Sequence, residues 1–255
     1  MEIKNSIAIV AGGASGLGEA TVCGLVKEGS KVAVLDFDEE KGKKLVLTLD
    51  DNAIFCKTDI SDEVSVKDAI EKTITAFGAI HIAVNCAGIA PPAKVLGKKG
   101  PIAISDFNRV IQINLIGTMN IVRLAAEKMV YNKPNDDGEK GVIINTASIA
   151  AFEGQVGQAA YSASKAGVVG MTLPIAREFA DIGIRVITIA PGLFDTPMLA
   201  GLPEKARASL IQTIPFPRRL AKPSEYAMLV KHIIENPVLN GETIRLDSAI
   251  RMGAR

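Results

Sequence analysis

Short apolar runs alternate with longer stretches of helical periodicity along this chain. The apolar runs are nearly continuous in Val, Ile and Ala, a pattern typical of strands that are covered on both faces. They predict strands at residues 6–10, 31–36, 53–57, 80–85, 141–147, 184–190 and 243–246. The periodic stretches between them predict helices, among them residues 18–28, 62–77 and 107–130.

This alternation predicts an α/β fold, a single doubly wound domain of the Rossmann type in which helices cover both faces of a parallel seven-stranded sheet. A length of 255 residues suits one such domain spanning residues 1–255, and the chain has no internal repeat. Residues 94–101 and 132–141 are expected to be surface loops. The proline-rich residues 192–223 are expected to form a lid over the substrate site, with a short helix near 203–213.

Composition and charge narrow the range of partners. Apolar residues make up 48% of the chain and charged residues 22%, with a net charge of +1 and both signs mixed throughout. Without a basic patch, the sequence predicts no nucleic-acid partner. No apolar run reaches about 18 residues, so no membrane span is expected. The short polar N-terminus has no signal or transit pattern, which favours a bacterial cytoplasmic enzyme and is compatible with a mitochondrial matrix enzyme.

The cysteines and histidines predict neither a disulfide framework nor a metal site. Cys23, Cys56 and Cys86 are odd in number and form no CxxC motif, which suits a reducing compartment. The two histidines, His81 and His232, have no second ligand at metal-binding spacing. No metal is therefore expected.

A glycine-rich turn follows the first predicted strand. Residues 11–18 read Ala-Gly-Gly-Ala-Ser-Gly-Leu-Gly, and glycine allows both a sharp turn and close approach of backbone N–H groups to a pyrophosphate. The helix that follows directs its positive end at such an anion. A turn of this kind between a strand and a helix predicts dinucleotide binding rather than an ordinary connection.

Asp36, at the end of the second predicted strand, indicates which dinucleotide binds. A carboxylate there accepts hydrogen bonds from the adenosine ribose hydroxyls and repels a 2′-phosphate. Residues 37–40 are Phe-Asp-Glu-Glu and the glycine-rich turn contains no cation, so these features favour NAD over NADP. Asp59, after the third strand, is expected to contact the adenine edge. It could instead cap the next helix, a position that Ser61 or Asp62 suits better.

Tyr161 and Lys165 form a candidate catalytic pair. They are four residues apart and so lie on one face of a predicted helix. A phenol has a pKa of about 10, and a neighbouring ammonium favours the phenolate, which could take the proton of an alcohol as hydride leaves the carbon. Because this spacing is common on surface helices, the pair indicates catalysis only together with other motifs of the chain. Ser148, at the end of a predicted strand, could donate a hydrogen bond to the reacting oxygen or could simply cap a turn.

Together, these motifs resemble those of the short-chain dehydrogenase/reductase family. The ordered set is GxxxGxG, Asn85-Cys86-Ala87-Gly88, Asn114, Ser148, the Tyr161–Lys165 pair and Pro191-Gly192. In that family an Asn, Ser, Tyr and Lys tetrad performs the chemistry, which by position implies Asn114, Ser148, Tyr161 and Lys165. The resemblance further implies that the Asn holds a water linking the Lys to solvent and that the Lys also binds the nicotinamide ribose.

The resemblance also implies the contacts of cofactor and substrate. The residues expected at the cofactor are Gly12, Ser15, Gly16, Leu17, Gly18, Asp36, Asp59, Ile60, Cys86, Ala87, Gly88, Tyr161, Lys165, Pro191, Phe194 and Thr196. Those expected at the substrate are Ser148, Gln155, Gln158 and Tyr161. The chain departs from the family pattern where Ala11 replaces a Thr, Cys86 replaces an Asn, and Ser248-Ala249 replaces Gly-Gly. These changes are expected to loosen the glycine-rich turn and alter C-terminal packing without removing the chemistry.

A narrower resemblance points to the substrate. Residues 141–158, 215–217, 234–247 and the Lys98-Lys99-Gly100 insertion are similar to type II 3-hydroxyacyl-CoA dehydrogenases, a group also called hydroxysteroid dehydrogenases. The resemblance implies oxidation of (S)-3-hydroxyacyl-CoA to 3-oxoacyl-CoA, in fatty-acid or branched-chain amino-acid breakdown, by a homotetramer. Lys98 and Lys99 could bind the CoA phosphates or could form a solvated loop. The apolar lid residues, which suit a fatty chain or a steroid, are Phe194, Met198, Leu199 and Leu202.

Three alternatives stay open on the sequence alone. A 3-oxoacyl-carrier-protein reductase normally uses NADPH, and Asp36 argues against that cofactor. A hydroxysteroid or other secondary-alcohol dehydrogenase would share the same tetrad. A non-catalytic, NAD-bound scaffold subunit belongs to another class of function, and the intact tetrad argues against it.

Overall fold

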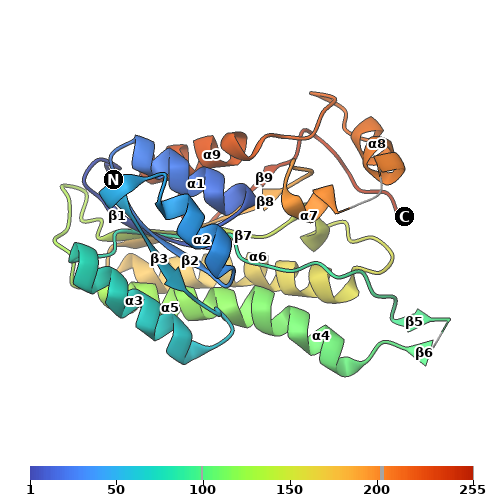
Figure 1. Cartoon of the computed structure of the whole chain (residues 1–255), viewed down its shortest axis with the longest axis horizontal. Helices are drawn as coiled ribbons and strands as arrows, with labels where there is room; N and C mark the ends of the chain where they lie inside the picture. Colours follow the sequence, from blue (N-terminus) through green and yellow to red (C-terminus); the bar gives the residue numbers. More distant parts are fainter. Residues whose placement is uncertain (99, 202–203, 255) are drawn as a thin grey trace.

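The computed structural model describes residues 1–98, 100–201 and 204–254 and contains a seven-stranded parallel sheet (Figure 1). Its strands are β1 (Ile7–Ala11), β2 (Lys31–Asp36), β3 (Ala53–Lys57), β4 (Ile82–Asn85), β7 (Gly141–Thr146), β8 (Ile184–Pro191) and β9 (Thr243–Leu246). In the sheet they follow the order β3-β2-β1-β4-β7-β8-β9. The predicted doubly wound α/β fold is confirmed, and each predicted strand is present.

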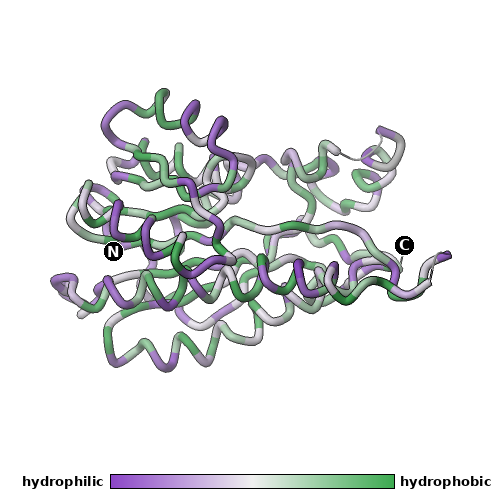
Figure 2. Tube along the Cα trace, turned by 60° about the horizontal axis from the view of Figure 1, so that its bottom comes forward, coloured by the Kyte–Doolittle hydropathy of each residue, from purple (hydrophilic) through white to green (hydrophobic). Residues whose placement is uncertain are grey.

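Helices form a layer on each face of the sheet. The helices of the described residues are α1 (Gly16–Lys27), α2 (Glu39–Val46), α3 (Glu63–Phe77), α4 (Ile104–Ile111), α5 (Gly117–Met129), α6 (Ala159–Ala180), α7 (Pro197–Ala200), α8 (Glu204–Gln212) and α9 (Pro223–Glu235). Apolar side chains of α1, α2 and α9, such as Val22 and Val230, pack on one face. Those of α3, α5 and α6, such as Ile70 and Ile175, pack on the other. Figure 2 shows hydrophobic and hydrophilic stretches alternating along the helices, as expected of helices with one buried side.

The strand order places a crevice at the carboxyl edge of the sheet. The chain runs from β1 outward to β2 and β3, then crosses to β4 on the other side of β1. The connections that leave β1 and β4 therefore diverge, and ligands of open α/β sheets bind at such a point. The glycine-rich turn follows β1, and Cys86-Ala87-Gly88 follows β4, so both motifs meet at this crevice.

The segment around Asn114 differs from the prediction. The sequence predicts one helix over residues 107–130, whereas the structure has α4, a π-helical turn at Gln112–Ile116, and α5. The predicted helical stretch is present, but apolar periodicity does not register the extra residue of a π turn, and such turns are frequent at functional sites. Asn114 lies within this turn and is fully buried.

Two irregular segments acquire local structure. Residues 94–101 form a short antiparallel hairpin of β5 (Leu96–Gly97) and β6 (Gly100–Pro101). The expected lid contains α7 and α8, and α8 matches the short helix predicted near 203–213. Lys99, Leu202 and Pro203, on which parts of these predictions fall, lie outside the described residues. Across the described part of the chain, no helix is both long enough and apolar enough to cross a membrane.

Candidate active site

The turn after β1 requires its glycines. Gly12 and Gly16 have φ values of +70° and +56°, in the left-handed region that favours glycine. A Cβ on Gly12 would also lie 2.6 Å from the backbone nitrogen of Ala87, so the turn packs directly against the segment after β4. Ser15 is the N-cap of α1, but its side chain makes no capping hydrogen bond. The first N–H groups of α1 therefore face the crevice and can bind an anion such as a pyrophosphate.

Asp36 is held beside this turn by two backbone donors. Its Oδ2 accepts a hydrogen bond from the Ala14 N–H at 2.9 Å, and its Oδ1 accepts one from the Asp38 N–H at 3.0 Å. Each carboxylate oxygen can accept a second hydrogen bond, so the group can still receive the two hydroxyls of a ribose. The next lysine along the chain, Lys41, pairs with Asp38 at 2.7 Å rather than presenting a charge for a phosphate.

Tyr161 and Lys165 lie on successive turns of α6 and face the end of β7. The Lys165 Nζ donates a hydrogen bond to the Thr146 carbonyl at 2.7 Å and lies 5.9 Å from the centroid of the Tyr161 ring. Lys165 is only 4% exposed, and this burial lowers its pKa to about 8. Burial raises the pKa of Tyr161, and the nearby Ser148 hydroxyl partly offsets that rise. Burial therefore disfavours the charged form of each group.

Ser148 is oriented by the turn it caps. It follows β7 and is the N-cap of a 3₁₀ turn at Ile149–Ala151, where its Oγ accepts a hydrogen bond from the Ala150 N–H at 3.1 Å. The capping interpretation of Ser148 is confirmed, and its hydrogen bond to a reacting oxygen stays a prediction. Because the capping bond uses the hydroxyl as an acceptor, its proton stays available for donation to a reacting oxygen.

Asn114 ties the segment after β4 to α6. Its Oδ1 accepts a hydrogen bond from the Ile89 N–H, and its Nδ2 donates to the Ile89 carbonyl, both at 2.8 Å. The same Nδ2 lies 3.1 Å from the Ser164 Oγ. A Cβ on Gly88 would lie 3.2 Å from the Asn114 Oδ1 and 3.5 Å from the Lys165 Nζ, so both polar groups approach one small space beside Gly88. The water-binding role of Asn114 stays a prediction.

Cys86 occupies a buried polar cluster behind the site. The Tyr226 hydroxyl lies 2.7 Å from the Thr146 Oγ1, and the Cys86 Sγ lies 3.8 Å from each of these oxygens. Burial raises the pKa of the Cys86 thiol, which keeps it neutral and poorly nucleophilic. Sequence reasoning missed Thr146 and Tyr226, since no local motif marks residues that meet only across the sheet.

The remaining expected cofactor residues fall into two groups. Pro191 ends β8, and Thr196 lies beside the glycine-rich turn, since a Cβ on Gly16 would be 3.3 Å from its Cγ2. The Phe194 ring, by contrast, is buried edge-on against Tyr226, with ring centroids 6.4 Å apart. The contact of Phe194 with the cofactor stays a prediction.

The connection after β3 completes this side of the crevice. The Asp59 Oδ1 accepts hydrogen bonds from the Ser61 N–H and hydroxyl, and Asp62 is the N-cap of α3, as its sequence position suggested. Asp59 is exposed. Ile60 is buried. A Cβ on Gly117 would lie 2.7 Å from the Ile60 Cδ1, so the Ile60 side chain packs closely against the start of α5.

Gln155 and Gln158 hold the loop that leads into α6. The Gln158 Oε1 accepts a hydrogen bond from the Gln155 N–H at 3.0 Å, and the Gln155 Nε2 donates to the Gly253 carbonyl at 3.1 Å. Both side chains are thus engaged in positioning the loop. Their contacts with substrate stay predictions.

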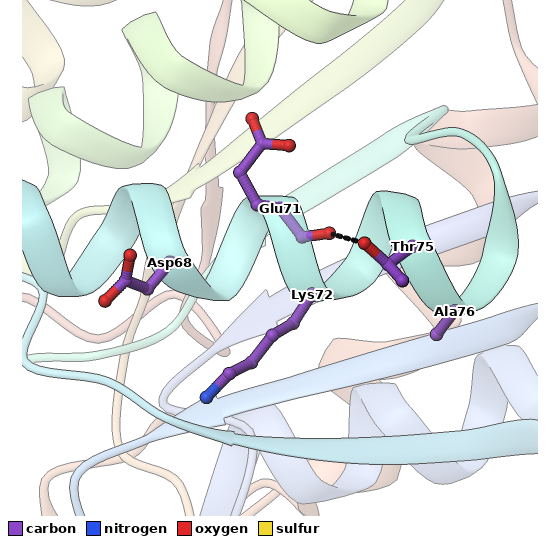
Figure 3. A pocket seen from close by; sticks show the side chains of 5 residues that line it. All are labelled: Asp68, Glu71, Lys72, Thr75 and Ala76. Atoms are coloured by element: carbon purple, nitrogen blue, oxygen red, sulfur yellow. Dashed lines mark hydrogen bonds between the residues drawn. The ribbon is translucent and has the colours of Figure 1, made fainter.

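A hollow of about 380 Å³ lies elsewhere, on the outer surface of α3 (Figure 3). It is lined by Asp68, Glu71, Lys72, Thr75 and Ala76. The Thr75 hydroxyl is satisfied within the helix by the Glu71 carbonyl at 2.8 Å, and the Glu71 carboxylate pairs with Lys128. None of the tetrad borders this hollow, so the strand-edge crevice remains the candidate site. The described ranges also contain no group of three or more His, Cys, Asp or Glu side chains suited to a metal ion.

Comparison with known proteins agrees with this geometry. A family model described as short chain dehydrogenase matches residues 6–207. A 3-hydroxyacyl-CoA dehydrogenase type-2 from Drosophila melanogaster is 54% identical over 252 residues, covering 98% of this chain and 99% of the relative. The crystal structure of 3-hydroxyacyl-CoA dehydrogenase type-2 from Mycobacterium avium superposes with a TM-score of 0.94 at 41% identity, covering 98% of each chain. A 3-ketoacyl-(acyl-carrier-protein) reductase from Brucella melitensis, complexed with NADH, gives a TM-score of 0.89 at 27% identity, covering 98% of this chain and 100% of that one.

Proposed function

The chain belongs to the short-chain dehydrogenase family, and we propose that it is an NAD-dependent dehydrogenase that oxidises (S)-3-hydroxyacyl-CoA to 3-oxoacyl-CoA. The observation that carries the oxidoreductase assignment is the meeting of Ser148, Tyr161 and Lys165 at the carboxyl end of β7, beside a glycine-rich turn. The acyl-CoA assignment is supported by the relative that shares 54% of its residues over nearly the full length of both chains.

The crevice residues fit NAD. The Gly12 turn has no room for side chains, α1 presents free N–H groups, and the Asp36 carboxylate suits a ribose with two free hydroxyls. NAD held there would supply the acceptor for the hydride that leaves the carbinol carbon. The protein's own contribution is to hold the substrate and to manage the hydroxyl proton.

Tyr161 and Lys165 manage that proton as a coupled pair. A tyrosinate next to an ammonium is stabilised by their attraction, so the charged forms that burial disfavours singly are favoured together. The Thr146 carbonyl keeps the Lys165 Nζ in place through its 2.7 Å hydrogen bond. The Tyr161 Oη then accepts the proton of the substrate hydroxyl, while the Ser148 hydroxyl donates a hydrogen bond to the same oxygen.

The lid and its surroundings support an acyl thioester as the substrate. Leu193, Leu199 and Ile211 pack around the buried side chains of Ile149 and Ile214, next to Ser148. This apolar surround suits an acyl chain. Lys98, exposed on the turn of the β5–β6 hairpin, offers a cation for the phosphates of CoA.

Turnover with defined substrates tests the proposal. NADH formation is measured spectroscopically with (S)-3-hydroxybutyryl-CoA, with a 3-hydroxyacyl-carrier protein and with a hydroxysteroid, each with NAD and with NADP. We expect the CoA thioester with NAD to have the highest kcat/KM. Preference for the carrier-protein substrate with NADP would favour the reductase alternative, and absence of turnover with every substrate would favour a scaffold.

Replacing Asp36 tests the cofactor assignment. Asp36→Ala should lower the ratio of kcat/KM for NAD to that for NADP by about 10- to 100-fold, since hydrogen bonds to a charged group contribute about 1.5–3 kcal/mol. Glu40→Gln is the matched control, because it removes an exposed charge near Asp36 and leaves the pair of Asp38 and Lys41 intact. An unchanged ratio in Asp36→Ala would contradict the role of this carboxylate.

A homotetramer in solution is also proposed. A groove of about 240 Å³ between α5 and α6 is lined by Met119, Ile175, Phe179 and other residues, and Leu173 of α6 is exposed nearby. Apolar groups on an outer helical layer favour association. Light scattering of the purified protein measures the mass, and a monomer would contradict this proposal.

A further inference from the structure

The loop between Ser148 and Tyr161 has little regular structure to position it. After the 3₁₀ turn at Ile149–Ala151, residues 152–158 form turns and bends until α6 begins at Ala159. Because one catalytic residue lies at each end, a shift of this loop would move the wall of the substrate site between them. Contacts from other parts of the chain must therefore hold it.

Those contacts come from the C-terminal segment, residues 250–254. The Glu153 Oε2 accepts a hydrogen bond from the Met252 N–H at 3.3 Å. The Gln155 Nε2 donates to the Gly253 carbonyl, and the Val156 N–H donates to the Ala254 carbonyl, both at 3.1 Å. The loop and the C-terminal segment thus run side by side, joined by three hydrogen bonds.

Glu153 is the charged centre of this junction. Its two carboxylate oxygens bind the Arg245 guanidinium at 2.8 and 3.1 Å, a two-pronged geometry that fixes both partners. Arg245 is held in turn by the Asp247 Oδ2 at 2.7 Å and stacks over the Phe152 ring, 5.2 Å from its centroid. The side chains of Glu153 and Arg245 are 23% and 24% exposed, so solvent screens this pair less than it screens an ordinary surface pair.

The same junction rests on an apolar cluster that reaches the lid. Ile149, which directly follows Ser148, is buried with Ile214 and Ile250, and Met252 packs against them. Ile214 follows α8 and Ile250 begins the C-terminal segment, so movement of that segment would disturb both the lid and the neighbour of Ser148.

We propose that Glu153 is a positioning residue for substrate binding, because its ion pair with Arg245 holds residues 250–254 and the loop 152–158 together as one wall of the acyl site. This inference rests on the proposed function for its substrate. We assign Glu153 no part in hydride transfer, because neither Tyr161 nor Lys165 is among its hydrogen-bond or ion-pair partners.

Glu153→Gln keeps the shape of the side chain and removes its charge. We expect the KM for 3-hydroxybutyryl-CoA to rise about tenfold, equivalent to about 1.4 kcal/mol, while kcat changes much less and the Kd for NADH, measured by fluorescence, stays the same. Arg245→Gln should also raise KM, and the double variant should raise it by less than the product of the two single effects, because the two residues share one contact. Arg251→Gln is the control: Arg251 reaches the same carboxylate at 3.3 Å, but its side chain is 60% exposed, so KM should hardly change.

Hydrogen–deuterium exchange gives a readout that does not depend on the substrate. In Glu153→Gln, residues 152–158 and 250–254 should exchange faster than in the wild type, while α1 should be unchanged. If exchange and KM both stay at wild-type values, the inference is wrong. If the wild type does not turn over any 3-hydroxyacyl-CoA, the proposed function fails, and the exchange result still decides the role of Glu153. Should Glu153→Gln not fold, removal of residues 252–255 replaces it, with the same rise in KM expected and an unchanged KM overturning the inference.

Discussion

Tyr161→Phe should lower kcat by about 100- to 10,000-fold, the range expected when a general base is removed. The variant keeps the ring that packs beside Lys165 and loses only the hydroxyl that accepts the substrate proton. NADH binding depends on the glycine-rich turn, α1 and Asp36, which the substitution does not touch. Steady-state rates with 3-hydroxybutyryl-CoA and fluorescence titration with NADH measure the two effects separately.

The matched control for this variant is Tyr131→Phe. Tyr131 is 85% exposed at the end of α5, so loss of its hydroxyl should leave both kcat and NADH binding unchanged. Two results would count against the role of Tyr161: retention of more than a few per cent of activity, or loss of NADH binding together with activity.

Lys165→Met should abolish most activity and yet stabilise the protein. Burial lowers the pKa of Lys165 from 10.5 to about 8, so below pH 8 the folded protein carries an ammonium that its surroundings disfavour. At one pKa unit per 1.36 kcal/mol, this penalty is about 3 kcal/mol at pH 7. The variant removes the penalty but leaves the buried Thr146 carbonyl without its donor, at a cost of about 1–3 kcal/mol. The net gain of up to about 2 kcal/mol should raise Tm by up to about 8 °C for a chain of this size.

The pH dependence of this gain has a definite sign. Between pH 8 and 10.5 the unfolded chain binds more protons at Lys165 than the folded protein does, so stability from this group rises with pH and the penalty disappears near 10.5. The difference in Tm between Lys165→Met and the wild type should therefore be full at pH 7 and smaller at a pH above 9. Thermal unfolding at both pH values measures it. Lys231→Met is the control, since Lys231 lies at the surface in ion pairs with Glu28 and Glu235 and has no burial penalty to lose. A Lys165→Met variant less stable than the wild type at pH 7 would contradict this account.

Stability and catalysis oppose each other at Lys165 for one physical reason. Burial makes the ammonium costly, and the same low-polarity surroundings strengthen its effect on the neighbouring phenol. The Thr146 carbonyl can accept a hydrogen bond from either the charged or the neutral amine, whereas a carboxylate partner would lock the charge in place. This choice of partner leaves the proton on Lys165 exchangeable.

The local pattern of apolar and polar residues was sufficient to predict most of the fold. All seven sheet strands were predicted, most of them because they are short apolar runs that the two helical layers cover, and a strand of this kind shows its burial directly in its residue types. The glycine-rich turn was predictable for a similar reason. Gly12 has no room for a Cβ, so the close packing around this position is already indicated by the presence of glycine. The pair of Tyr161 and Lys165 was readable from helical spacing, although its weight came only from Ser148, Asn114 and Asp36 in the same chain.

Other features depend on contacts between elements that are distant in sequence. The helix predicted over residues 107–130 contains a π turn that the local pattern did not indicate, and Asn114 within this turn binds Ile89 and Ser164. The Phe194 ring packs on Tyr226, a contact that depends on where α9 lies, and the contact of Phe194 with the cofactor stays a prediction.

The amino-acid sequence by itself determined the strands and the glycine-rich turn, and it predicted Asp36 as the ribose partner and Tyr161 and Lys165 as the proton-carrying groups, since each depends on residues close together in the chain. Only the tertiary structure decided that the Thr146 carbonyl anchors Lys165, that Asp36 is held by the glycine-rich turn and that Glu153 meets Arg245, 92 positions away. These contacts join separate elements, and their geometry follows from how the sheet and its two helical layers pack together. That packing set the burial that lowers the pKa of Lys165, and no local pattern of residues encodes it.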